Sequence, residues 1–139
     1  MKGELIINGA DAFEKWGVSM GKGFLDAIDT FAPMKDYVVN NSRLEHGERV
    51  LLGKPKVDAR DVTLAFTILG TSESDYRAKR LAFESMLQNG FVNVVVPSLG
   101  SQTYKLIYLG KSPSYNMNLS RTFAEVSVKF REPNPMDRQ

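Results

Sequence analysis

The stretch that decides the fold is VDARDVTLAFTIL, residues 57–69. From residue 61 onward, large apolar side chains alternate with small or polar ones, and this period is typical of a strand with one buried face. The apolar set is Val62, Leu64, Phe66 and Ile68, and the set between them is Asp61, Thr63, Ala65 and Thr67. We therefore predict an antiparallel strand over residues 57–69 that packs its apolar set against a core.

An amphipathic helix is predicted directly after this strand. Ser72 is followed three residues later by Asp75, as in a capping box, and Asn89-Gly90 supplies a helix stop. A helix of about four turns between these signals would lie across a sheet. Its apolar stripe consists of Tyr76, Phe83, Met86 and Leu87.

The rest of the chain reads mainly as strands and turns. Asp11 is expected to cap a helical turn over residues 12–16, with Gly17 as its stop. Further strands are predicted over residues 5–7, 18–25, 46–52, 91–96, 104–109 and 122–130, and looser chain over 30–44 and 113–118. The fold class is therefore α+β, mainly β: an antiparallel β-sandwich or partly closed barrel with one helix packed on it. Residues 1–130 form one domain, and residues 131–139 an exposed C-terminal arm, because Pro133 and Pro135 oppose regular structure.

Composition limits the function more by exclusion than by indication. The 139 residues are 42% hydrophobic and 24% charged, which suits one globular domain. A net charge of +2 is too small to mark a nucleic-acid-binding protein by itself. The absence of cysteine and the single histidine, His46, exclude disulfides, thiolate chemistry and multi-histidine metal sites. No apolar run is long enough for a signal peptide or membrane span, so we expect synthesis in the cytoplasm.

Catalytic patterns are not found. His46 lies in a charged segment, and no serine sits in a G-x-S-x-G turn. The carboxylates of Asp58 and Asp61 flank Arg60, so we interpret them as a charge-paired strand start. The pair Glu73 and Asp75 carries no sign of a cleft, and Gly21-Lys22-Gly23 lacks the remainder of a nucleotide-binding motif and is interpreted as a turn or bulge. We expect no enzyme activity, no catalytic residues, no cofactor and no metal.

Aromatic residues support two alternative binding functions. Tyr104 and Tyr108, near Lys105 and Lys111, would suit a β-barrel module that stacks single-stranded nucleic acid, although sheet packing is the more usual reason for their even spacing. A carbohydrate-binding sandwich would need Trp16 or Tyr115 exposed in a groove, whereas Trp16 is more simply a core or interface residue.

Four stretches together resemble a known family: DAFEKWGV (residues 11–18), MKDYVVNNSRLEHG (34–47), VDARDVTLAF (57–66) and VKFREPNP (128–135). Their order is similar to the N-terminal domain of distal tail proteins in the baseplates of tailed phages and prophages. The resemblance implies a non-enzymatic virion structural protein that forms a homo-oligomeric, commonly hexameric, ring between the tail tube and the baseplate hub. It would assemble in the host cytoplasm and end in the virion tail, with no room for the family's second, carbohydrate-module-like domain. Tail-tube and tail-terminator proteins of the same fold lineage are the alternative.

A ring requires segments that reach a neighbouring subunit. The loop over residues 30–44 and the C-terminal arm are the two candidates, since exposed apolar residues there would suit a partner surface. The alternative is that the loop folds back over its own core. The expected interface residues are Phe31, Met34, Tyr37, Val38, Arg131, Pro133 and Pro135.

Overall fold

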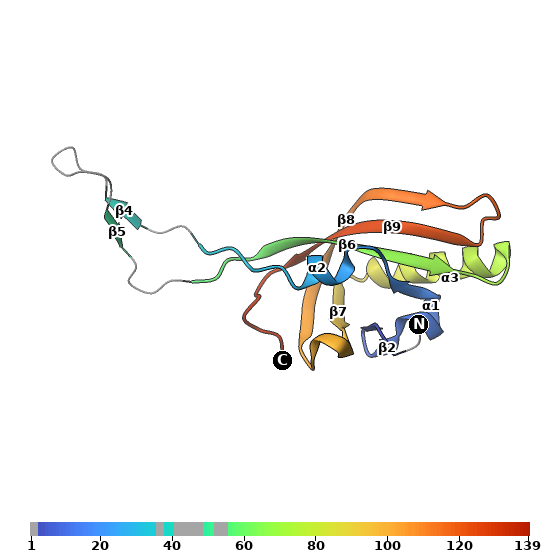
Figure 1. Ribbon diagram of the computed structural model, residues 1–139, viewed down its shortest axis with the longest axis horizontal. Helices are drawn as coiled ribbons and strands as arrows, with labels where there is room; N and C mark the ends of the chain where they lie inside the picture. Colours follow the sequence, from blue (N-terminus) through green and yellow to red (C-terminus); the bar gives the residue numbers. More distant parts are fainter. Residues whose placement is uncertain (1–2, 36–37, 41–48, 52–55) are drawn as a thin grey trace.

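A seven-stranded antiparallel sheet forms the body of the protein, with strand order β2-β1-β7-β8-β9-β6-β3 (Figure 1). The structure, a computed structural model, describes residues 3–35, 38–40, 49–51 and 56–139. The sheet comprises β1 (Ile6–Ile7), β2 (Ala10–Asp11), β3 (Val18–Met20), β6 (Arg60–Leu69), β7 (Phe91–Val95), β8 (Thr103–Met117) and β9 (Phe123–Glu132). A separate pair is formed by β4 (Val38–Asn40) and β5 (Arg49–Leu51). The helices are α1 (Ala12–Trp16), α2 (Phe24–Ile28), α3 (Glu73–Leu87) and the short 3₁₀ turn η1 (Pro97–Leu99).

The predicted strand over residues 57–69 is confirmed from Arg60 onward as β6, at the centre of the packing. It pairs with β9 along its whole length, from Arg60 opposite Glu132 to Leu69 opposite Phe123. All four predicted core positions on β6 are at most 5% exposed. The apolar set of β9 is buried in the same way: Ala124, Val126, Val128 and Phe130. Because two strands in register turn their apolar sets to the same side, they form one continuous face of the core.

The predicted helix is confirmed as α3, with one difference at its start. The Ser72 hydroxyl accepts the Asp75 N–H at 3.1 Å, as expected of an N-cap. The Asp75 carboxylate accepts the N–H of Thr71 (2.8 Å) instead of closing back onto Ser72. This bond, together with the bond from Lys79, lowers the pKa of Asp75. The predicted stripe of Tyr76, Phe83 and Leu87 is buried, and Met86 packs against the core.

Phe66 of β6 lies where the helices and the sheet meet. Its ring packs edge-on against the rings of Phe24, Phe83 and Phe130, with centroids 5.4, 5.3 and 6.2 Å away. Figure 1 shows the sheet curling so that β7, β1 and β2 lie beneath β6 and β9, with α3 across the same interior. The fold class is confirmed, and of the two predicted architectures the single curled sheet is the partly closed barrel.

The strand predicted over residues 18–25 is wrong in its second half. β3 ends at Met20, and Gly21 and Gly23 form a turn that leads into α2. Gly23 has a φ of +80°, a conformation that glycine adopts without strain. The side chains of Phe24 and Ile28, which lie one helical turn apart, are both buried. The interpretation of Gly21-Lys22-Gly23 as a turn is confirmed.

The loose stretch predicted over residues 113–118 is also wrong, because β8 continues to Met117. β7 pairs with β8 only as far as Ile107, so from Tyr108 onward β8 has β9 as its sole partner in this sheet. A strand with one open side tolerates Pro113, which has no N–H to donate. The register with β9 shifts twice in this part, on either side of Lys111.

Candidate assembly interface

Between α2 and β6 two chain segments project away from the sheet (Figure 1). We call these segments the legs; their described residues are 31–35 and 38–40 in the outgoing leg, and 49–51 and 56–58 in the returning leg. Near the body the legs are joined by two backbone hydrogen bonds of 2.9 Å, from Lys35 N–H to Lys56 O and from Asp58 N–H to Pro33 O. Further out, β4 and β5 pair in antiparallel register. The described part of this region is therefore a β ladder pointing away from the core, which we call the extension. The sequence predicted a loop over residues 30–44, and a strand over 46–52 whose described part is β5.

Large apolar side chains are exposed where the extension begins. Phe31 is 95% exposed and Met34 is 41% exposed. Of the other interface residues predicted here, Val38 lies in β4, and Tyr37 falls outside the described residues. Burial of an exposed phenyl ring against a partner would release a large amount of free energy.

A buried arginine fixes the base of the extension to the body. The Arg60 side chain is 3% exposed, and its Nη1 and Nη2 donate to the carbonyl oxygens of Thr30 (2.6 Å) and Ile28 (2.7 Å). Its Nε donates to Oε1 of Glu132 at 2.6 Å. The predicted pairing of Arg60 with Asp58 and Asp61 is wrong. Arg60 has the same parity along β6 as Val62 and its side chain enters the interior, where Glu132 lies opposite it in the register.

The same carboxylate holds the end of the chain. Both Glu132 oxygens accept from Arg138, from Nε and Nη2, at 3.0 Å each. The guanidinium carbons of Arg138 and Arg60 lie 4.9 and 5.9 Å from the centroid of the Tyr104 ring, within cation–π range. The Arg138 carbonyl also accepts the Thr103 N–H (3.0 Å). The last residues are thus tied to the start of β8 and to Arg60.

The residues predicted as an exposed C-terminal arm differ from one another in burial. Glu132 and Pro135 are buried, whereas Pro133 and Met136 are exposed. Arg131 belongs to β9, is half exposed, and its Nε donates to Asp61 (2.8 Å). That ion pair raises the pKa of Arg131.

Glu132 is ionised despite its burial. Desolvation alone would raise the pKa of this carboxyl, but the hydrogen bonds from Arg138 and Arg60 outweigh it and hold the pKa below its ordinary value. The reciprocal bond raises the pKa of Arg138. The two guanidiniums exceed the one carboxylate by one positive charge, which is stabilised by the two carbonyl oxygens at the end of α2.

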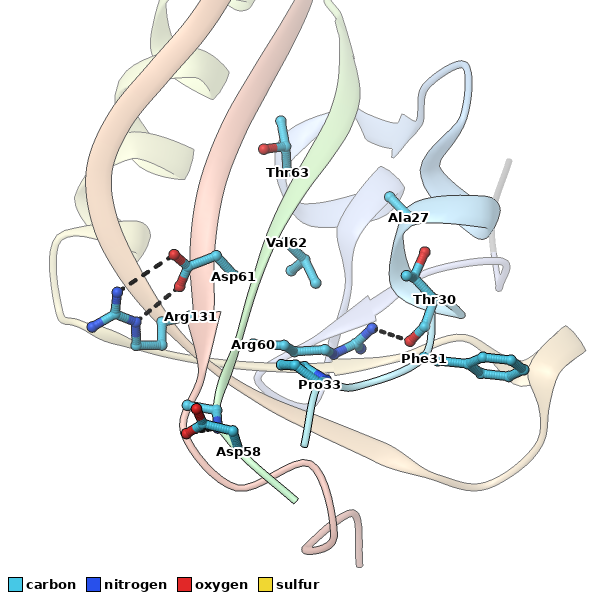
Figure 2. Close-up of a pocket in the computed structure, with 11 residues that line it drawn as sticks. Ala27, Thr30, Phe31, Pro33, Asp58, Arg60, Asp61, Val62, Thr63 and Arg131 are labelled. Carbon is cyan, nitrogen blue, oxygen red and sulfur yellow. Dashed lines mark hydrogen bonds and ion pairs between the residues drawn. The ribbon is translucent and has the colours of Figure 1, made fainter. Parts of the chain in front are cut away.

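A pocket of about 710 Å³ lies beside this anchor, between the end of α2 and the start of β6 (Figure 2). We call it the base pocket. Its wall includes Thr30, Phe31, Pro33, Asp58, Asp61 and Thr63. Figure 2 shows the Phe31 ring pointing away from the other labelled residues and the Arg60 side chain reaching Thr30.

The aromatic residues considered for other functions lie mainly in the core. Trp16 and Tyr104 are 3% and 2% exposed, and Tyr108 is partly buried, so the packing interpretation is confirmed. Tyr115 is 40% exposed, and its hydroxyl hydrogen-bonds to that of Tyr76. Burial is the main cause that raises the pKa of Tyr76, and this hydrogen bond is the second. His46 falls outside the described residues.

Among the residues that the structure describes, no group of three or more histidine, aspartate or glutamate side chains is placed to hold a metal ion. None of the helices in the described part of the chain combines the length and the apolar character needed to cross a membrane.

The comparisons with known proteins give a likeness in fold. Neither a protein-family model nor a curated protein matches the sequence. Among solved structures, the chain is similar to the Dit protein of phage SPP1, described as a paradigm of the hub adsorption apparatus in phages that infect Gram-positive bacteria. The TM-score is 0.63 at 14% sequence identity, over 95% of this chain. The chain spans about half the length of that protein, since 50% of it is covered. This chain therefore has the fold of a phage distal tail protein.

Proposed function

We propose that this protein is a structural component of a phage or prophage tail, which assembles as a ring of identical subunits where the tail tube meets the baseplate. The observation that carries the proposal is the fold match to Dit over nearly the whole chain. As the family resemblance implies, the ring would commonly have six subunits, would contact the tail-tube and baseplate hub proteins, and would form in the host cytoplasm before residing in the virion tail. In this role the protein acts by binding and not by catalysis.

The extension supports the choice of self-assembly over a binding module for small ligands or nucleic acid. A 95% exposed phenylalanine beside a projecting β ladder is costly for a monomer and useful at an interface. A closed ring needs interfaces of about 1,000 Å² or more, which a projecting ladder lying on a neighbour would help to supply. Tyr104, by contrast, is buried and is closed to base stacking.

Native mass spectrometry and light scattering over a range of concentrations test the proposal, with the protein alone and mixed with a tail-tube protein of the same phage or prophage. We expect a closed oligomer of defined number. The double variant Phe31→Ser, Met34→Ser should shift the population toward monomer. Leu81→Ser is the matched control, because Leu81 is 48% exposed on α3, away from the extension. A monomer under all these conditions would contradict the proposal.

A further inference from the structure

The turn between β8 and β9 presents an apolar side chain and a cation at the opposite end of the body from the extension (Figure 1). Leu119 is fully exposed at this turn. Arg121, two residues on, is also exposed and makes no ion pair with any residue that the structure describes. Arg77 and Glu73 of α3 line the same shallow hollow as Arg121 and leave this end with one net positive charge.

This turn is held rigidly by its own backbone and by one side chain. Asn118 Oδ1 accepts the N–H groups of Thr122 (3.1 Å) and Phe123 (3.3 Å). The Asn118 N–H donates to Phe123 O at 2.9 Å, and Arg121 adopts a φ of +58°. Such a turn loses little conformational freedom when it binds, which favours its use as a preformed insert.

The base pocket carries the complementary features. Phe31 offers an exposed ring at its rim. Asp58 offers a carboxylate that is exposed and whose hydrogen bond is to the neighbouring Ala59 N–H (2.8 Å). Asp61, on the same wall, is neutralised by Arg131 at 2.8 Å. Arg60 and Arg131 also line the pocket, but each is paired with a carboxylate, Glu132 and Asp61 respectively. The pocket therefore presents an apolar rim and one carboxylate, that of Asp58, with no cation paired to it in the described part of the chain.

We propose that the β8–β9 turn of one copy inserts into the base pocket of the next, with Leu119 against Phe31 and Arg121 facing Asp58. A pocket of about 710 Å³ falls within the usual size of binding pockets and has room for both side chains. The contact joins two different surfaces at opposite ends of the subunit, so repeating it produces a head-to-tail series that closes when the rotation allows. This inference depends on the proposed ring, and it assigns the two surfaces through which neighbouring subunits of the ring would bind each other. It would act as the interface's central anchor, with the extension supplying further area.

Charge reversal provides the sharpest test. Arg121→Asp and Asp58→Arg should each raise at least tenfold the subunit concentration at which half of the protein is assembled. The two single variants mixed in equal amounts should assemble again, because each reversed turn then meets a reversed pocket and each native turn a native pocket. The double variant Arg121→Asp, Asp58→Arg should also assemble. Asp26→Arg is the control for the pocket side, since Asp26 lies on α2 outside the base pocket. Alone it should assemble like the wild type, and in a mixture it should not recruit Arg121→Asp copies into the assembly.

Leu119→Ser tests the apolar half of the contact against Leu81→Ser, and we expect only the first to weaken assembly. Fluorescence of the buried Trp16 checks that every variant is folded. An oligomeric wild type whose assembly is unchanged by Arg121→Asp, Asp58→Arg and Leu119→Ser would overturn this contact and leave the proposed ring standing. Singly reversed variants that dissociate but do not assemble on mixing would overturn the pairing of Arg121 with Asp58. A wild type that stays monomeric would overturn both the contact and the ring.

Discussion

The body and the extension are both β ladders, but they differ in what covers their side chains. In the body, β6 has a strand on each side and an apolar face sealed by α2 and α3. At the base of the extension, two legs pair with each other, and Phe31 stands in solvent. Burial, not backbone pairing, provides most of the stability of a sheet, so the two regions should respond very differently to truncation. The contrast also separates the residues that keep the subunit folded from those available for a partner.

The largest effect is expected in the body, at Phe66. Phe66→Ala removes a fully buried ring from contact with three others, and we expect the free energy of unfolding to fall by about 3–5 kcal/mol. Urea titration followed by Trp16 fluorescence measures it. A loss below 1 kcal/mol would contradict the assignment of Phe66 to the centre of the core.

The anchor between the regions comes next. Glu132→Ala leaves the buried guanidinium of Arg60 and the partly buried one of Arg138 without their carboxylate, and we expect a loss of about 3 kcal/mol in the free energy of unfolding. Glu125→Ala is the matched control, because Glu125 lies exposed on the same strand. Equal losses in the two variants would show that the buried cluster contributes nothing specific.

Acid should weaken the same anchor. The pKa of Glu132 is lowered in the folded state, so its stabilisation is fully present above the ordinary carboxyl pKa of 4.5 and is lost as the pH falls through the lowered value. We therefore expect the drop in unfolding free energy between pH 6 and pH 3 to be smaller in Glu132→Gln than in Glu125→Gln. Denaturant titrations at the two pH values measure it, and identical drops would contradict the lowered pKa.

A helix cap in the body gives a smaller effect. Ser72→Ala removes the acceptor of the Asp75 N–H and should cost about 1 kcal/mol of unfolding free energy. Ser72→Asp keeps an acceptor and should retain most of the stability. A thermal-melting series of the three proteins distinguishes a cap from a tolerated surface serine.

The smallest effect on folding is expected in the extension. Phe31→Ala removes a ring that is 95% exposed and should change the unfolding free energy of the monomer by less than about 0.5 kcal/mol. The measurement is the urea titration used for Phe66→Ala, at a concentration where the protein is monomeric. A loss of several kcal/mol would erase the distinction between the two regions.

Much of the body could be predicted from the sequence because its signals are local. The alternation of apolar with small or polar residues predicted β6 and β9. Helix start and stop residues predicted α1 and α3, and Asp11 and Gly17 cap α1 as expected. α2 was missed because two glycines interrupt its approach and only five residues form it. The spacing of Phe24 and Ile28, one helical turn apart, was the available signal.

The anchor and the base pocket could not be read from local patterns. Arg60 and Glu132 are 72 residues apart and meet only through the register of β6 and β9. A usable signal was present, since each charged residue falls on the apolar side of its own strand's alternation. The base pocket needs the end of α2 beside β6, and the prediction gave residues 24–25 to a strand and residues 26–28 to no element. The expectation of an interface near Phe31 and Met34 stays a prediction.

The bond from Arg60 to the carbonyls of Ile28 and Thr30 has a mechanical consequence. A pull on the extension reaches the body at Thr30, passes through one guanidinium into Glu132, and continues to β9 and Arg138. This side-chain path runs beside the two backbone connections of the extension, to α2 and to β6. Load on the projecting ladder therefore has a direct route to the last residues of the chain through one guanidinium and one carboxylate.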